Sequence, residues 1–246
     1  MCYRYSVPGP KELEKEFDAE FARKESFART YHVSSFDLPR LPVITNEDPK
    51  QIQLFVWGLI PFWVKDEHGA EKIRVQTMNA RSETLYEKPA FRQSAVDKHC
   101  LVLADGFFEW QEVQGRKYPY YIRLKSHKPF AMAGVWDHWV NTATKEDLFS
   151  YSVITTKANP LMERIHNTKK RMPVILGKEE RQYWLARSLS KDEAVSLLAP
   201  YDQNEMEAFT ISRLLTTRGK NPNVPAVLHP FVYPELQQAS RQAPLF

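Results

Sequence analysis

The feature of this chain that most restricts its fold is a succession of short apolar stretches between residues 101 and 156. They run from Leu101 to Trp110, Tyr118 to Lys125, Phe130 to Val140 and Leu148 to Thr156. Each is typical of a β-strand, and the first is the most hydrophobic, which predicts a central position for it. So many short strands in succession predict a mostly antiparallel sheet that folds on itself in a barrel-like way.

Helical patterns flank the predicted sheet, so we expect an α+β fold. Leu13, Phe17 and Phe21 recur every four residues among charged side chains, which predicts an amphipathic helix that extends to about Thr30. Shorter patterns complete the prediction: helices at 159–165, 179–187 and 191–199, strands at 51–57, 73–77 and 208–211, and loops around Pro39 and Pro42 and at 58–63.

The length and composition favour one domain. The chain has 246 residues, of which 43% are hydrophobic, and this is enough for one substantial core. No Gly/Ser-rich or low-complexity linker interrupts the pattern, so we expect a single domain over residues 1–230 and a C-terminal tail at 231–246. The Pro-rich segment from Arg218 onward lacks periodicity, and we expect it to wrap over the surface as a loop.

The composition also argues against several classes of protein. No apolar run approaches the ~18 residues of a membrane span and no charged-then-apolar leader begins the chain, so we expect a cytoplasmic protein. Cys100 lies in an apolar strand sequence and should be buried and inert. No C-x-x-C or H-x-x-x-H spacing occurs, so we expect neither a metal nor another cofactor. The net charge of +4 permits a nucleic-acid partner without requiring one.

The second residue, Cys2, has a chemistry of its own if the initiator Met1 is removed. The mature chain then begins with an amine and a thiol on adjacent carbons. The amine can attack an aldehyde to form an imine, and the thiol can close a five-membered thiazolidine ring on the same carbon. An α-amino group has a reference pKa of ~7.8, against ~10.4 for Lys, so it is the better amine nucleophile at neutral pH.

Glu109 is an anomaly in an apolar sequence, because it lies between Phe108 and Trp110. Such a carboxylate is either exposed at a strand end or held in an apolar pocket. In a pocket, desolvation would raise its pKa toward neutrality and suit it to proton transfer. His166 follows the predicted helix at 159–165, and a cluster of basic residues, 169–171, lies beside it.

Together these segments resemble one known family. The resemblance is carried by Cys2, by residues 57–63 (WGLIPFW), 79–84 (NARSET) and 106–110 (GFFEW), and by His166 with residues 171–176 (RMPVIL). In this order they are similar to the SRAP family, the SOS-response-associated peptidases that are abasic-site processing proteins. The resemblance covers roughly residues 1–230 and implies a SRAP-like fold.

The resemblance also implies an activity. Members recognise abasic sites in single-stranded DNA and link their N-terminal cysteine to the sugar aldehyde as part of the DNA damage response. It implies that Cys2 is the reactive residue, exposed by autoproteolytic removal of Met1, and that Asn79, Glu109 and His166 are catalytic. Strand cleavage by an AP-lyase reaction is a further implied activity. His166 near its ordinary pKa of ~6.5 would assist sugar-ring opening, Glu109 would move protons during imine formation, and Asn79 would hold the amine or a sugar oxygen.

The same resemblance implies which residues contact DNA. Arg4 and Arg81 are expected to bind phosphates beside the active site, with Arg171 as a third. Trp63 and Trp110 are expected to bound the DNA strand, since indole faces stack on bases without reading sequence. The expected partner is single-stranded DNA with an abasic site, and we expect the protein to act as a monomer. Two other tryptophans, Trp57 and Trp136, are expected in the core.

Two other functions agree with the residues alone. In an N-terminal-nucleophile amidase or cysteine peptidase, Cys2 would attack a carbonyl and its own amine would be the base. In a non-catalytic module that binds single strands, Cys2 would have no chemical role. The mass of the intact protein after mixing with abasic-site DNA separates the three alternatives.

Overall fold

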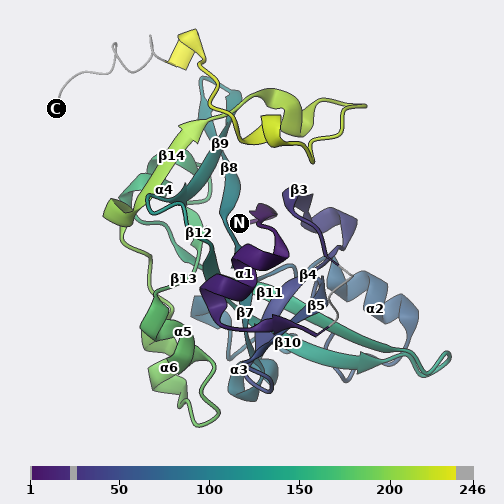
Figure 1. Ribbon diagram of the computed structural model, residues 1–246. Helices are drawn as coiled ribbons and strands as arrows, with labels where there is room; N and C mark the ends of the chain where they lie inside the picture. Colours follow the sequence, from purple (N-terminus) through teal and green to yellow (C-terminus); the bar gives the residue numbers. More distant parts are fainter. Residues whose placement is uncertain (1, 23–26, 237–246) are drawn as a thin grey trace.

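Five strands form a closed barrel in the computed structural model, which describes residues 2–22 and 27–236 (Figure 1). Around the barrel they are β11 (Asp147–Lys157), β10 (Phe130–Val140), β7 (His99–Ala104), β4 (Arg40–Thr45) and β5 (Gln51–Trp57). The successive pairs from β11 to β5 are antiparallel. A parallel pairing of β5 with β11, in which Val56 lies opposite Ser150, closes the ring. The expected barrel-like α+β fold is confirmed.

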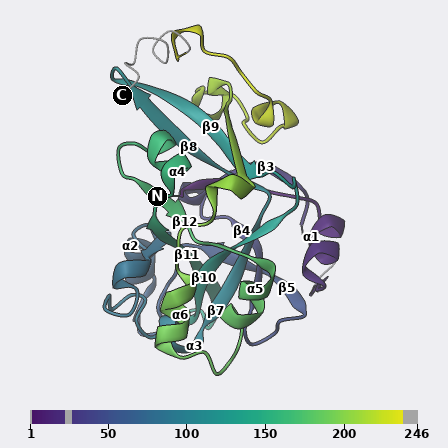
Figure 2. The same ribbon diagram turned by 90° about the vertical axis from the view of Figure 1, so that its left-hand side faces the viewer.

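A second antiparallel sheet carries the beginning of the chain. Its order is β14 (Met206–Thr210), β9 (Arg116–Leu124), β8 (Gly106–Val113), β1 (Arg4–Val7) and β3 (Thr30–Ser34). The first residues of the chain therefore lie between β8 and β3, and Tyr5 pairs with Phe107 and with Val33. Figures 1 and 2 show β8 and β9 rising from the barrel toward the C-terminal segment.

Four short strands extend this framework. They are β2 (Glu20–Phe21), β6 (Asn79–Arg81), β12 (Arg171–Pro173) and β13 (Ile175–Leu176). Strand β6 pairs in parallel with one edge of β11 and β12 pairs antiparallel with the other, and Thr155 is opposite Arg81 on one side and Pro173 on the other. The C-terminal end of β11 therefore brings together two segments that the sequence assigns to the site, residues 79–81 and 171–173.

Short helices cover the sheets. They are α1 (Pro10–Phe17), α2 (Glu67–Arg74), α3 (Ser94–Asp97), α4 (Pro160–Ile165), α5 (Lys178–Trp184) and α6 (Lys191–Leu197). The predicted start of α4 is confirmed, because the Asn159 side chain accepts a hydrogen bond from Met162 N at 2.9 Å and Pro160 is the first helical residue. Within the described ranges, none of the helices is long and apolar enough to span a membrane.

The core follows the sequence prediction for the tryptophans. Trp57 and Trp136 are buried inside the main apolar cluster, and so is Cys100. The indole N–H of Trp57 donates to the carbonyl of Met78 at 2.8 Å, so its polar atom is satisfied inside the core. This bond also fixes the residue that directly precedes Asn79.

The helix expected from Leu13 to about Thr30 is wrong beyond Phe17. Asp18 adopts a left-handed conformation with φ 50° and ends α1. Phe21 then enters the short strand β2, beside Ile52 of β5. The four-residue spacing of Phe21 therefore reflects burial in a strand and not a third helical turn; residues 23–26 of the predicted helix lie outside the described residues.

Three further expectations about local structure are wrong. The apolar stretch from Leu101 to Trp110 is two strands, because Asp105 separates β7 in the barrel from β8 in the second sheet. The alternation predicted as a strand at 73–77 lies at the end of helix α2 and in the turn after it. Pro42, expected in a loop, lies within barrel strand β4, where its residue partner is Leu54.

Candidate active site beside the amino terminus

Cys2 lies two residues before the start of β1, in the interior of the protein. Its side chain is fully buried, and its Sγ is 3.9 Å from the carbonyl oxygen of Arg4. The next residue is also fixed, because Ser35 N donates to the carbonyl oxygen of Tyr3 at 2.9 Å. Burial, and then the negative charge of Glu109, raises the pKa of the Cys2 thiol to about 12. The thiol is therefore protonated at neutral pH.

Glu109 projects from β8 next to the segment that carries Cys2. Strands β8 and β1 run antiparallel with Tyr5 opposite Phe107, so Glu109 is at the level of the residues that precede β1. Its side chain is buried, which decides between the two sequence-based alternatives in favour of a pocket. Desolvation by burial raises the pKa of Glu109 to about 7. The carboxyl is thus suited to both giving and taking a proton near neutral pH.

His166 is the residue at which helix α4 ends, as the sequence predicts. Its Nδ1 is 2.9 Å from the carbonyl oxygen of Arg171 and 3.7 Å from Oε1 of Glu109. Because a carbonyl oxygen only accepts, Nδ1 carries the proton and Nε2 carries the lone pair in the neutral ring. The expectation that His166 titrates near 6.5 is wrong, since burial lowers its pKa to about 4. The imidazole is therefore neutral at pH 7.

Asn79 is the first residue of β6, where Val153 of β11 is its partner. Only 9% of its surface is exposed, and neither its Oδ1 nor its Nδ2 has a hydrogen-bond partner within the described part of the chain. Leaving a buried amide unpaired costs on the order of 1–3 kcal/mol per group. Such a cost is typical of a side chain whose partner is a ligand.

Two buried tyrosines connect these elements, and no sequence pattern indicates them. The hydroxyls of Tyr5 and Tyr151 are 2.6 Å apart, and the Tyr5 ring lies 4.8 Å from the Trp57 ring. Trp57 is in turn bonded to Met78, next to Asn79. Burial raises the pKa of both tyrosines well above the ordinary value, and a thiolate at Cys2 would raise it further. The tyrosine pair therefore lies near Cys2 and links β1 to β11, the barrel strand with which β6 pairs.

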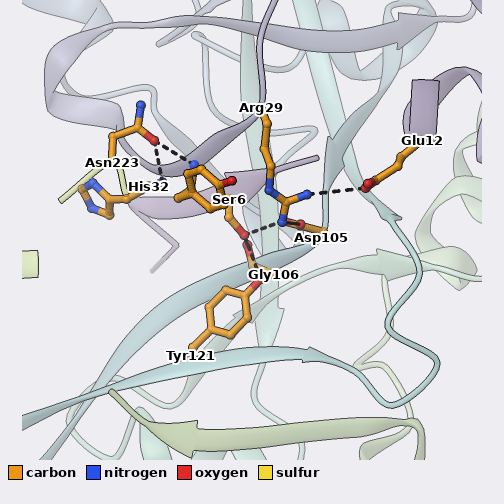
Figure 3. A network of polar contacts seen from close by, with 9 residues as sticks. Ser6, Glu12, Arg29, His32, Asp105, Gly106, Tyr121 and Asn223 are labelled. Carbon is orange, nitrogen blue, oxygen red and sulfur yellow. Dashed lines mark hydrogen bonds and ion pairs between the residues drawn. The ribbon is translucent and has the colours of Figure 1, made fainter. Parts of the chain in front are cut away.

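Arg4 is held at the edge of the site by an aromatic ring and a histidine. Its guanidinium carbon lies 5.6 Å from the Trp110 ring centroid, and its Nη1 donates to Nε2 of His32 at 3.2 Å. Burial, and then the charge of Arg4, lowers the pKa of His32 to about 4, so His32 is neutral and accepts the bond. His32 belongs to β3, and Asn223 holds this strand in place through its Oδ1, which accepts a hydrogen bond from Tyr31 N at 2.8 Å (Figure 3). Sequence reasoning missed His32 and Asn223, because both contacts join residues that are distant along the chain.

The remaining predicted DNA contacts differ in their surroundings. Arg81 is exposed at the end of β6, and its charge lowers the pKa of Tyr3, against burial and Glu109, which raise it. Arg171 is mostly buried and donates two hydrogen bonds to the carboxylate of Glu83, one of them at 2.9 Å, and another to the carbonyl of Thr155. It therefore neutralises a neighbouring acid.

Trp63 lies on the loop after β5, as the sequence predicts, and 46% of its surface is exposed. In the described part of the chain, no hydrogen bond, ion pair or ring contact joins it to the other predicted site residues. Its loop is fixed by Asp137, whose Oδ2 accepts from Phe62 N at 3.0 Å. The structure thus places Trp63 on an anchored loop.

The arrangement as a whole is a site for proton transfer beside a thiol. It combines a carboxyl with a pKa of about 7, a neutral imidazole and an unpaired amide. Over residues 2–22 and 27–236, no group of three or more His, Cys, Asp or Glu side chains could hold a metal ion. The chemistry that this chain's residues offer is acid–base and nucleophilic.

Comparison with known proteins identifies relatives along most of the chain. The chain is 43% identical over 183 residues to the abasic site processing protein YoqW of Bacillus subtilis, which covers 74% of this chain and 78% of that protein. It is 37% identical over 225 residues to the abasic site processing protein YoaM of the same organism, and the match covers 90% of this chain and 95% of that protein. A crystal structure of a protein from Bacteroides thetaiotaomicron superposes with a TM-score of 0.88 at 39% identity and covers 94% of this chain and 100% of that one.

The family assignment follows from the extent of these matches. The model of the family described as SOS response associated peptidase (SRAP) matches residues 1–217. That range contains every residue to which the sequence assigned a role in the site, from Cys2 to Arg171. The fold agrees, since the Bacteroides thetaiotaomicron structure has the same architecture over nearly its whole length. This chain belongs to the SRAP family, the SOS response associated peptidases.

Proposed function

We propose that this protein processes abasic sites in single-stranded DNA by linking Cys2 covalently to the sugar aldehyde. The names of its relatives support abasic-site processing. The observation that carries the covalent mechanism is Glu109, a buried carboxyl whose pKa is raised to about 7 and whose charge acts on the Cys2 thiol. A residue that gives and takes protons near pH 7 is what the condensation of an amine with an aldehyde requires.

The reaction begins with hydrolysis of the peptide bond between Met1 and Cys2, which consumes one water and leaves a free α-amine on Cys2. The amine then adds to C1′ of the ring-opened sugar. Glu109 in its protonated form donates a proton to the departing hydroxyl, and water leaves to give an imine. The thiol adds to the imine carbon and its proton passes to the nitrogen, so that a thiazolidine ring closes.

The order of attack follows from the thiol's environment. A Cys2 thiol with a pKa of about 12 has roughly one part in 10⁵ as thiolate at pH 7, so it is a weak first nucleophile. An α-amine with a reference pKa of ~7.8 is neutral in a far larger fraction. The amine therefore attacks first and the thiol second. The same comparison counts against an amidase in which the thiol attacks a carbonyl first.

Asn79 and His166 have separate tasks in this mechanism. The unpaired amide of Asn79 binds the terminal amine or a sugar oxygen, and either would satisfy its buried groups. His166 presents Nε2 as a base, because its Nδ1 proton is held by the carbonyl of Arg171. A base next to the imine also supports an AP-lyase step, in which a proton leaves C2′ and the 3′ phosphate departs with the electrons of the C3′–O bond.

DNA is held by the predicted arginines and tryptophans. Arg4, Arg81 and Arg171 bind phosphates, and Trp63 and Trp110 bound the strand by stacking. The contact of Arg4 with Trp110 supports a shared role for these two, because one orients the other. Such contacts read no base sequence, so binding is expected to tolerate any flanking sequence.

The test is the intact mass of the protein after incubation with a single-stranded oligonucleotide that contains one abasic site. Loss of Met1 and addition of the DNA mass minus one water, stable to heat and denaturant, is the expected result. Cys2→Ala should abolish the stable adduct, since the remaining amine forms only a reversible imine. Cys100→Ala is the matched control, because Cys100 is equally buried but lies in β7 of the barrel.

Two other outcomes would favour the alternatives. Peptide hydrolysis without a DNA adduct would support the amidase, and salt-sensitive DNA retention without either would support a binding module. A heat-stable adduct of undiminished yield in Cys2→Ala would contradict the thiazolidine mechanism.

A further inference from the structure

A cleft of about 710 Å³ opens directly beside the candidate site. Arg4 belongs to both, since it stacks over Trp110 in the site and also lines the cleft. Phe36 lines the cleft as well, and its ring stacks on that of Tyr3 with the centroids 5.3 Å apart. Tyr3 is the residue next to Cys2. One wall of the cleft is therefore continuous with the residues that flank the reactive cysteine.

The ring of Phe36 is presented to solvent in a way that packing does not explain. It is 62% exposed although it lies in the short 3-10 turn at Ser35–Asp37, between barrel strand β4 and strand β3. Its orientation is fixed on one face by Tyr3. The other face is therefore a rigid aromatic surface of the size that a nucleobase covers when it stacks.

The polar groups of the cleft are mostly donors. Arg40 is exposed and makes no ion pair within the described residues. Asn221 and Asn223 each use their amide oxygen to accept a backbone N–H, at 2.9 Å and 2.8 Å, so the group that each can offer a ligand is its NH₂. Figure 3 shows the contacts of Asn223. Arg29 is committed to Asp105 at 2.9 Å, as Figure 3 also shows. Asp37 is the acidic side chain among the residues that line the cleft.

A wall of donors beside an exposed aromatic ring fits one class of ligand, a nucleotide with its phosphate. We propose that this cleft binds the nucleotide on one side of the abasic residue, with its base stacked on Phe36 and its phosphate bound by Arg40 and the asparagine amides. This inference rests on the proposed function, which places the abasic sugar at Cys2. It adds a binding subsite outside the residues that carry the covalent chemistry.

The cleft also assigns a role to residues beyond the family match. That match ends at residue 217, whereas Asn221 and Asn223 follow it. Asn223 both lines the cleft and fixes β3 through its bonds to Tyr31 and His32. The C-terminal segment thereby forms part of the DNA-binding surface.

The test uses single strands that end at the abasic position. Two probes carry a tetrahydrofuran residue, which has no aldehyde and cannot form the crosslink, with four nucleotides only on its 5′ side or only on its 3′ side. Affinity is measured by fluorescence anisotropy. Phe36→Ala should weaken one of the two probes by about fivefold or more, the lower end of the effect of losing one stacked base, and leave the other unchanged. Phe36→Trp should restore binding.

Arg40→Ala should weaken the same probe and flatten its plot of log affinity against log salt by about 0.7, whereas Phe36→Ala should leave the slope unchanged. The matched controls are Tyr183→Ala and Arg187→Ala, an exposed aromatic residue on α5 and an exposed arginine just after it. Both should bind like the wild type.

Several results would overturn the proposal. They are equal weakening of both probes, weakening of neither, an effect of Tyr183→Ala as large as that of Phe36→Ala, or no measurable binding of either probe by the wild type. A protein that forms the adduct but shows no effect of Phe36→Ala refutes the cleft alone. A protein that shows the one-sided effect but forms no adduct refutes the covalent mechanism alone.

Discussion

The Nδ1 atom of His166 lies 3.7 Å from Oε1 of Glu109, and both side chains are buried. Burial shifts the two pKa values in opposite directions, that of Glu109 up to about 7 and that of His166 down to about 4. Both shifts favour the neutral form. Between about pH 4 and pH 7 the carboxyl is protonated and the imidazole is not, so the two groups face each other as neutral partners and neither buries an uncompensated charge.

The opposite shifts predict opposite effects on stability. The folded pKa of Glu109, about 7, exceeds its ordinary value of 4.5, so its contribution is fully present below pH 4.5 and is lost as pH rises through 7. The folded pKa of His166, about 4, is below its ordinary 6.5, so its contribution is present above pH 6.5 and is lost as pH falls through 4. In the wild type these two dependences largely cancel.

Single substitutions should expose each dependence. Compared with the wild type, Glu109→Gln should gain stability as pH rises from 4.5 to 7, by on the order of 1–3 kcal/mol, because only the pH dependence contributed by His166 remains. His166→Gln should lose stability over the same range. Urea unfolding at several pH values measures both, and parallel curves for the wild type and both variants would contradict the assignment.

Asn79 offers a test that separates function from stability. Its buried amide is unpaired, so Asn79→Leu should raise the free energy of unfolding by about 1 kcal/mol while slowing adduct formation at least tenfold. Asn46 is the control, because it is also buried but its amide oxygen accepts from His99 N at 3.0 Å and its NH₂ donates to Asp97 O at 2.8 Å. Asn46→Leu should destabilise the protein and leave the rate of the folded fraction unchanged. Destabilisation by Asn79→Leu would sink the idea that a ligand completes this site.

The sequence predicted the parts of this protein whose patterns are local. Strands β9, β10 and β11 are rich in aromatic, β-branched and other apolar residues, and α4 begins with its own cap and proline, so neighbouring residues determine each element. Cys2 is notable for its aminothiol chemistry and Glu109 for its place in an apolar sequence, whereas the catalytic roles of Asn79 and His166 are implied by the family's motifs alone. The sequence alone leaves Glu109 either exposed or in a pocket, because burial of a strand residue depends on which segments cover it.

The rest could not be predicted, because it depends on contacts between distant segments. Asp105 lies between the two strands, and Ser6 and Arg29 from distant segments bind its carboxylate there (Figure 3). The pKa of His166 follows from burial under β8, and the pairing of Arg171 with Glu83 joins segments 88 residues apart. Three-dimensional proximity of this kind leaves no trace in periodicity or composition.

The contact between Arg4 and His32 predicts energetic coupling in DNA binding. Arg4 can only donate, so the neutral ring of His32 must accept and thereby orients the guanidinium. Arg4→Ala should weaken binding of single-stranded DNA, and His32→Ala should reproduce part of that loss although it removes no positive charge. In the double variant the two effects should fall short of additivity by about 1 kcal/mol. His32→Gln, whose amide oxygen can accept the same bond, should restore affinity, and strict additivity would contradict a positioning role.

Arg81 and Arg171 flank the same end of β11, but their charges have different surroundings. Arg81 is exposed and has no ion pair within the described residues, whereas Arg171 is paired with Glu83 at 2.9 Å. Burial would raise the pKa of Glu83, but hydrogen bonding to Arg171 and the charges of Arg171 and Arg81 hold it below its ordinary value. Glu83 is therefore ionised and already neutralises one of the two arginines.

The salt dependence of binding should distinguish the two arginines. Each phosphate contact to a single strand contributes roughly −0.7 to the slope of log affinity against log salt. Arg81→Ala should flatten the slope by about this amount for any base sequence. Arg171→Ala should flatten it less and should also reduce stability, since its removal leaves Glu83 and the carbonyl of Thr155 without their donor. Glu83→Gln should steepen the slope, because it removes the negative charge that neutralises Arg171 and so strengthens the contact of Arg171 with phosphate. An unchanged slope in Arg81→Ala, together with a loss of 0.7 in Arg171→Ala, would reverse the assignment and make Arg171 the main phosphate contact at this edge of the site.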